Sequence, residues 1–253
     1  MRIVRFAKDG RTPFGVLEDD TISVISAHPY GDIQFTGDKV PLAEVRLLPP
    51  LPSKVIAIGK NYADHAREMG GEPPAEPVIF SKPSTSVIGP GDAVVYPQKL
   101  SQRVDFEGEL AVVIGAYCRN VTAARAAEVI LGYTCANDVT ARDLQKSDGQ
   151  WTRAKGFDTF CPLGPWIETE VDPADLAIQT RVNGEVRQDA RTSLLLHPVG
   201  ELIEYVSQVM TLLPGDVLLT GTPAGVGPLE IGDEVSVTIE SIGTLTNRVV
   251  ARE

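Results

Sequence analysis

Three acidic residues at the ends of apolar runs could hold a divalent metal ion. Glu107 and Glu109 lead into the apolar run 110–114, and strand alternation places both on one face. Asp138 follows a second apolar run, 133–136. Neighbouring carboxylates on a buried face repel one another unless a cation holds them together. An oxygen-only set without His or Cys suits Mg²⁺ or Mn²⁺, with Ca²⁺ a further possibility in crystals, and disfavours zinc.

The same pattern has an alternative interpretation, in which the acids lie in solvent at the start of a strand. For the Glu-x-Glu spacing alone, exposure is the more common outcome. Asp138, at the end of a second run, shifts the balance toward a metal site. Asp105 shares the strand face with Glu107 and Glu109 but is left out of the ligand set. We expect Asp105 to face solvent or to contact a residue behind the ligands.

A histidine and a glutamate in the segment 61–69 could transfer a proton. His65 and Glu68 are three residues apart, so they share one face of the predicted helix. Glu68 would raise the pKa of His65 and fix its orientation, as a general base requires. An exposed surface pair is the alternative. Glycines flank this helix, which is typical of a mobile lid.

The segment 221–227 is a glycine-rich loop that follows a predicted strand. It matches neither a P-loop nor a GxGxxG motif that opens a helix, so a nucleotide site is not indicated. Its glycines permit a tight turn, or bring backbone N–H groups close to a substrate carboxylate. Lys155 and Arg142 are the cations that would bind the substrate together with these N–H groups. Taken alone, each could equally be a charged residue on the surface.

The elements that position these residues are mainly strands. An N-terminal β unit is expected over residues 1–50, and the proline cluster at 49–52 reads as a linker to a catalytic domain over 51–253. Asn61, Thr122 and a Thr140–Asp143 capping box are expected to open helices. The resulting fold class is α+β, mainly β, with these strands and helices. Strands are predicted at 3–6, 14–17, 21–25, 54–58, 78–80, 93–96, 106–114, 133–136, 176–182, 185–188, 217–220, 234–240 and 244–250, and helices at 61–69, 122–131, after 138, and at 198–212.

Composition restricts the class of partner. The chain has 253 residues and a net charge of −11, which argues against nucleic acid, because such binding needs a basic face. A small anionic substrate would need a local cation to overcome this charge. Cys118, Cys135 and Cys161 are too sparse for a thiolate site. Without an apolar leader or span, the chain is expected in the cytoplasm, with no membrane partner.

Six ordered motifs resemble the fumarylacetoacetate hydrolase family. They are GKNYADHAREM at 59–69, FSKPSTSVIGPGD at 80–92, DFEGELAVVIG at 105–115, ANDVTARDLQ at 136–145, TRAKGFDTFCPLGPW at 152–166 and LLTGTPAGVG at 218–227. The resemblance runs from about residue 54 to 250. It implies the family's mixed β-roll fold, a homodimer, and a site beneath a lid.

The resemblance also implies a role for each residue that matches a motif. The metal ligands would be Glu107, Glu109 and Asp138; the catalytic residues His65, Glu68 and Lys155; and the substrate contacts Arg142, Gln145 and Thr222. The implied substrate is a small 2-oxo or 2,4-dioxo acid. Its C–C bond would be cleaved by hydrolysis or decarboxylation, with Mg²⁺ or Mn²⁺ stabilising an enolate. The alternatives are a 2-hydroxyhepta-2,4-diene-1,7-dioate isomerase of aromatic catabolism and a non-catalytic metal-binding protein.

Overall fold

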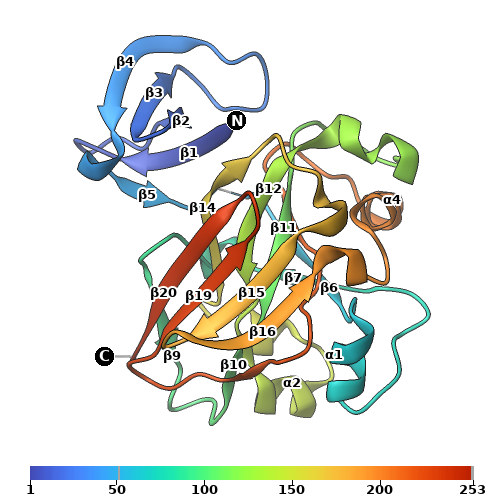
Figure 1. Cartoon of the computed structure of the whole chain (residues 1–253). Coiled ribbons are helices and arrows are strands. Elements are labelled where there is room, and N and C mark those ends of the chain that lie inside the picture. The colour runs from blue at the N-terminus through green and yellow to red at the C-terminus, as the bar shows by residue number, and fades with distance from the viewer. Residues whose placement is uncertain (51, 252–253) are drawn as a thin grey trace.

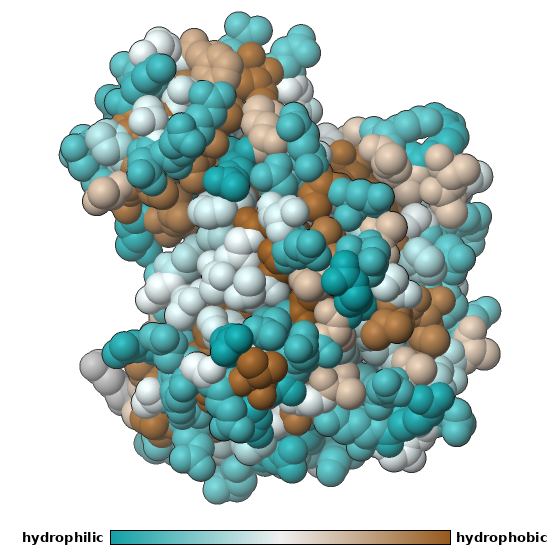
Figure 2. Space-filling view, in the orientation of Figure 1, coloured by the Kyte–Doolittle hydropathy of each residue, from teal (hydrophilic) through white to brown (hydrophobic). Residues whose placement is uncertain are grey.

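The computed structural model describes residues 1–50 and 52–251, and most of its elements are strands. A small N-terminal lobe stands beside a larger body in which two β-layers pack together (Figure 1). Hydrophilic residues cover most of the face seen in Figure 2, and apolar residues are scattered over it in small groups. The predicted α+β, mainly β fold class is confirmed.

The strands form three sheets. The largest contains β1 (Arg2–Ala7), β2 (Phe14–Glu18), β3 (Thr21–Ile25), β4 (Phe35–Pro41), β5 (Arg46–Leu48), β6 (Val55–Gly59), β7 (Val78–Lys82), β8 (Val87–Ile88), β11 (Gly108–Ile114), β12 (Ile130–Asn137), β14 (Cys161–Glu168) and β17 (Val217–Leu219). The second contains β9 (Ala93–Tyr96), β15 (Ala177–Val182), β16 (Glu185–Arg191), β19 (Glu234–Ile239) and β20 (Gly243–Ala251). The third contains β10 (Val104–Phe106), β13 (Thr140–Ala141) and β18 (Gly227–Pro228).

The helices are short, and the longest that the structure describes has eleven residues. The α-helices are α1 (Ala63–Glu68), α2 (Arg142–Asp148), α3 (Thr152–Lys155) and α4 (Val199–Val209). The 3-10 helices are η1 (Leu42–Glu44), η2 (Ser84–Ser86), η3 (Ala123–Val129), η4 (Pro173–Asp175) and η5 (Thr192–Leu194). In the described part of the chain, no helix has the length and apolar character needed to cross a membrane.

Strand β11 forms the centre of the core. Leu110, Val112 and Ile114 face the cluster that includes α4 and the second sheet, whereas Ala111 and Val113 face the opposite cluster. Both faces are therefore buried, which explains why this strand reads as a continuous apolar run. Strand β12 pairs with it antiparallel along its whole length, and β17 lies on its other side. The core thus fixes the start of β11 relative to the end of β12.

The N-terminal lobe is joined to the body by backbone pairing. Strands β1 to β4 form a meander, and β1 continues into the large sheet, where Arg2 pairs with Glu168 of β14. The N-terminal ammonium of Met1 lies 2.8 Å from a Glu168 carboxylate oxygen. One sheet therefore crosses the boundary predicted at residue 50.

Three local predictions were wrong for identifiable reasons. Residues 122–131 were expected to form one helix. Instead, Ala123–Val129 form the 3-10 helix η3, and β12 begins at Ile130 because the chain pairs with β11 from that residue onward. Asn61 does not cap α1; its buried amide donates to the backbone oxygens of His197 and Thr220. The Thr140–Asp143 capping box is absent, since Asp143 accepts from Ser101 instead. In contrast, the predicted Asn183-Gly184 hairpin joins β15 to β16.

Candidate active site

The three predicted metal ligands meet where two sheets join. Glu107 lies between the end of β10 and the start of β11, so the chain passes from the third sheet to the largest one at this residue. Gly108 pairs with Asn137, which brings Asp138 beside Glu107. The backbone N–H of Asp138 donates to the backbone carbonyl oxygen of Glu107 at 2.8 Å. One carboxylate oxygen from each of Glu107, Glu109 and Asp138 lies within 4.8 Å of the others, and all three residues are buried.

Two buried lysines neutralise part of this negative charge. The Lys155 ammonium donates to Glu107 at 2.7 Å and to Asp138 at 2.6 Å. Lys82, at the end of β7, donates to the other Asp138 oxygen at 2.5 Å. Burial alone would lower the pKa of Lys155, but Asp138 and Glu107 raise it, so this lysine stays charged. The sequence reasoning missed Lys82, although a single lysine after the strand run in the FSKP motif was a usable signal.

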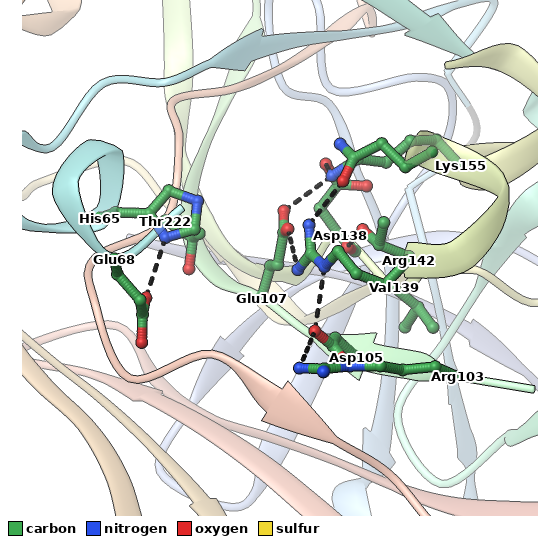
Figure 3. Close-up of polar contacts among 12 residues, drawn as sticks. His65, Glu68, Arg103, Asp105, Glu107, Asp138, Val139, Arg142, Lys155 and Thr222 are labelled. Atoms are coloured by element: carbon green, nitrogen blue, oxygen red, sulfur yellow. Dashed lines mark hydrogen bonds and ion pairs between the residues drawn. The ribbon is translucent and has the colours of Figure 1, made fainter. Parts of the chain in front are cut away.

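Arg142 contacts the carboxylates of Glu107 and Asp105 (Figure 3). Its guanidinium donates to Glu107 at 2.7 Å and to Asp105 at 2.9 Å, and it also donates to the Gln145 side chain at 2.8 Å. Asp105 is fully buried and also accepts from Arg103 at 2.9 Å. The expectation of a solvent-facing Asp105 was therefore wrong, because two arginines enclose it. The alternative, contact with a residue behind the ligands, holds.

The charges in this cluster fit a divalent cation. Burial would raise the pKa of Glu107, but Lys155 and Arg142 outweigh it and hold that pKa well below its usual range. Burial, together with repulsion from Asp138 and Glu107, raises the pKa of Glu109 well above its ordinary value. Among the described residues, Glu109 accepts one hydrogen bond, from the Gly221 N–H at 2.7 Å. A hard cation bound by oxygen ligands would relieve this repulsion.

The predicted proton-transfer pair lies on the other side of Glu107 from Lys155 (Figure 3). His65 and Glu68 are both in α1, and His65 Nδ1 lies 3.2 Å from a Glu68 oxygen. His65 is buried, so the exposed-pair interpretation does not apply to it. Burial lowers its pKa below the ordinary 6.5, although Glu107 and Glu68 act in the opposite direction. Glu68 thus raises the pKa as expected, but burial outweighs it, so the net shift is downward and the imidazole is neutral near pH 7.

The glycine-rich loop directs its N–H groups at protein carboxylates. Gly221 donates to Glu109, and Gly225 donates to both Glu68 oxygens at 3.1 and 3.2 Å. Both glycines have φ of +101°, and a Cβ on Gly225 would lie 2.1 Å from the Arg187 oxygen. The chain can take this path only with glycine at these positions. The loop thereby links the acidic cluster to α1.

A single cavity of about 210 Å³ brings these groups together. Two aromatic side chains that the sequence reasoning missed form part of its wall. Trp151 packs against Phe80 with ring centroids 5.1 Å apart, and Gly59 leaves the space that the Trp151 ring occupies. Asp138 and Glu68 contact the cavity residues Lys155 and His65 from behind. The predicted site residues in its lining are His65, Glu107, Glu109, Arg142, Gln145, Lys155 and Thr222.

Two family models match the chain. Residues 54–250 match the model described as fumarylacetoacetate (FAA) hydrolase C-terminal, and residues 1–50 match one described as Rv2993c-like, N-terminal. A crystal structure of 2-hydroxyhepta-2,4-diene-1,7-dioate isomerase from Mycobacterium marinum is 56% identical, with a TM-score of 0.93 over 100% of this chain and 99% of that one.

Two further relatives carry different activities in their names. Oxaloacetate tautomerase Fahd2a, a mitochondrial protein of Rattus norvegicus, is 46% identical over 83% of this chain and 71% of its own length. Maleylpyruvate hydrolase from Sphingobium sp. SYK-6, solved with manganese (II) and pyruvate, is 35% identical over 100% of both chains, with a TM-score of 0.83. These proteins are enzymes, and the named reactions differ between them. The chain described here belongs to the fumarylacetoacetate hydrolase family.

Proposed function

We propose that this protein is a divalent-metal-dependent enzyme that cleaves a C–C bond in small 2-oxo acids, with 2,4-dioxo acids as the preferred class. One observation carries the proposal: a buried, neutral histidine lines the same small cavity as Glu107 and Glu109, and Asp138 completes the converging set of three carboxylates directly behind the cavity wall. The carboxylates would hold the divalent ion that anchors an oxo-acid, and the histidine would accept a proton beside it. The proton-accepting group and the anchoring group are therefore separate.

Glu107, Glu109 and Asp138 are the residues that would hold the ion. When bound, Mg²⁺ or Mn²⁺ would supply Lewis-acid chemistry and positive charge for the carboxylate and 2-oxo oxygens of the substrate. The manganese and pyruvate in the maleylpyruvate hydrolase structure support this choice of ion and of ligand type. Lys155 and Arg142 lower the pKa of Glu107 and so keep its carboxylate ionised, as a metal ligand must be.

The chain's own groups suffice for the proton transfers. His65 would take a proton from water, and the resulting hydroxide would attack the 4-oxo carbon of the substrate. The C3–C4 bond then breaks, and its electron pair stays on C3 as the enolate of pyruvate. The proton on His65 returns to C3, so that pyruvate and a carboxylic acid are the products. Glu68 holds the imidazole by Nδ1, which leaves Nε2 for the water.

A second candidate is proton transfer without cleavage, that is, isomerisation or enol–keto tautomerisation of a 2-oxo acid. The names of the 56% and 46% identical relatives favour it. The same residues would serve, because His65 would then exchange a proton with substrate carbon rather than with water. Decarboxylation of oxaloacetate would need only the ion held by Glu107, Glu109 and Asp138, because no water attacks.

A substrate panel tests these candidates. Acetylpyruvate, oxaloacetate and 2-hydroxyhepta-2,4-diene-1,7-dioate are supplied with Mg²⁺ or Mn²⁺, and both pyruvate release and loss of the enol absorbance are followed. Pyruvate release that stops with EDTA and returns with Mn²⁺ is expected. Turnover of the dienedioate or of enol-oxaloacetate without pyruvate would replace cleavage by the second candidate. Absence of turnover on every member would reject both.

A further inference from the structure

Two lysines at the mouth of the cavity have no charged partner among the described residues. Lys60 follows β6 directly, and Lys146 lies in α2, next to the predicted substrate contact Gln145. Figure 1 shows α1 and α2 at the same end of the molecule, and residues of both helices line the cavity. Within residues 1–50 and 52–251, neither lysine forms an ion pair or a side-chain hydrogen bond. Lys60 is half-buried and Lys146 is exposed, so both ammonium groups remain open to a ligand.

The cations at the floor of the cavity, Lys155 and Arg142, are paired with acidic side chains of the protein. Lys155 donates to Glu107 and Asp138, and Arg142 donates to Glu107 and Asp105. Their charges are therefore balanced by the protein's own acids. A substrate carboxylate at the floor would depend on the divalent ion for its positive charge. The mouth, in contrast, has positive charge that no described acid balances.

The other groups at the mouth also favour an anion. The carboxylates that line the cavity are those of Glu107 and Glu109, and both are buried at the floor. Gln145 accepts from Arg142 through its side-chain oxygen at 2.8 Å, which orients its NH₂ group as a free donor. Lys146, the adjacent residue, adds a charged donor. The mouth thus offers donors to a ligand and no carboxylate that would repel an anion.

The charge of the whole chain makes such a local patch consequential. A net charge of −11 repels a dianion, and local cations in a cleft counteract that field. The cavity volume of about 210 Å³ is smaller than the roughly 300–1,000 Å³ of drug-sized pockets, so a short diacid fits its scale. An acid anchored at the floor by its 2-oxo carboxylate would extend toward Lys60 and Lys146.

The geometry points to a distal anion subsite formed by Lys60 and Lys146, with Gln145 as a neutral donor, that selects dicarboxylic over monocarboxylic 2-oxo acids. This inference rests on the proposed function for the placement of the 2-oxo end at the floor. The second carboxylate of the substrate would bind at the mouth. The two lysines are specificity-determining residues, and neither takes part in the proton transfers.

A matched pair of ligands tests the subsite by equilibrium binding, without any turnover. 2-Oxopentanedioate and 2-oxopentanoate have the same five-carbon chain and differ in a terminal carboxylate against a methyl group. Calorimetric titration with Mn²⁺ present is expected to give at least about fivefold tighter binding of the diacid at low salt. Lys60→Met and Lys146→Met should each remove about two- to fivefold of that preference, the range of a solvent-accessible ion pair. Lys99→Met, at an exposed lysine outside the cavity, is the control for net charge.

The outcomes separate this inference from the proposed function. Equal affinity for the two acids, or a double Lys60→Met/Lys146→Met variant that keeps the full preference, overturns the subsite. A preference that Lys99→Met lowers equally overturns it as well, because the general field would then be the cause. Absence of turnover in the substrate panel, combined with a lysine-dependent preference in binding, would reject the proposed reaction and retain the subsite. For turnover, 2,4-dioxoheptanedioate should have a lower KM than 2,4-dioxoheptanoate, and this difference should shrink as salt rises.

Discussion

The two sides of the cavity are built in different ways. Paired strands position Glu107, Glu109 and Asp138. Three buried cations, Lys82, Lys155 and Arg142, also hold the carboxylates of Glu107 and Asp138. His65 and Glu68 instead stand on α1, a helix of six residues. A helix of that length is not stable in isolation, so α1 depends on contacts such as the one from Gly225 to Glu68. Anchoring and proton transfer are thus carried by separate pieces of structure, and mutation should separate them.

The largest effect is expected on the α1 side. His65→Asn should lower kcat for cleavage by roughly 10²–10⁴-fold, the usual contribution of a general base. Affinity for Mn²⁺ should stay within about twofold, since in the described part of the chain His65 hydrogen-bonds Glu68 and none of the three predicted metal ligands. Steady-state kinetics and calorimetry on the same preparation measure both. A parallel loss of metal affinity would show that the two sides do not act separately.

The next effect concerns the anchoring side. Glu109→Gln should weaken Mn²⁺ binding by more than about 100-fold, because removing a ligand costs more than the 10–100-fold of a supporting residue. Without metal, the same variant should unfold at a higher temperature than the native chain, since it removes the repelled carboxylate. Thermal unfolding in EDTA and in Mn²⁺ tests both statements. Glu185→Gln, at an exposed site, is the control, and a lower unfolding temperature in EDTA would contradict the charge argument.

A smaller effect is expected behind the ligands. Asp105→Asn leaves Arg142 with Glu107 but weakens its second anchor, so kcat/KM should fall by about tenfold, the lower end of the range for supporting residues. Asp105→Glu, which keeps the charge, should recover part of the loss. If Arg142 is held by Glu107 alone, Asp105→Asn will have native kcat/KM.

The smallest effect is a shift in pH dependence. Because burial lowers the pKa of His65, its neutral form persists as pH falls, and the acid limb of kcat/KM should lie below pH 6.5. Glu68 raises that pKa, so Glu68→Gln should move the limb to still lower pH. A pH profile of both proteins measures the shift. A limb above 6.5 would mean that the charge of Glu107 and Glu68 outweighs burial.

The sequence was informative where chemistry and strand period coincide. Glu107 and Glu109 precede one apolar run, and Asp138 follows another. They could be brought together because the start of one strand lies beside the end of its antiparallel neighbour. The FSKP motif offered Lys82 as a candidate cation, but its contact with Asp138 and the burial of Asp105 could not be predicted, because they depend on which strands become neighbours in space. The net fall of the His65 pKa was missed for the same reason: spacing identifies Glu68 as the partner that raises this pKa, but the burial that lowers it further is set by the whole fold. The domain boundary at residue 50 stays a prediction.

The pairing of β1 with β14 has a consequence for the order in which the chain is made. Met1 and Glu168 are 167 residues apart in sequence, so at 5–20 residues per second the ribosome adds Glu168 roughly 10–30 s after Met1. Strand β5 arrives early and covers the second half of β1, from Arg5 to Ala7. Arg2 and Ile3 alone must wait for β14. This side of β1 therefore stays open only near Arg2 and Ile3 until β14 has been made.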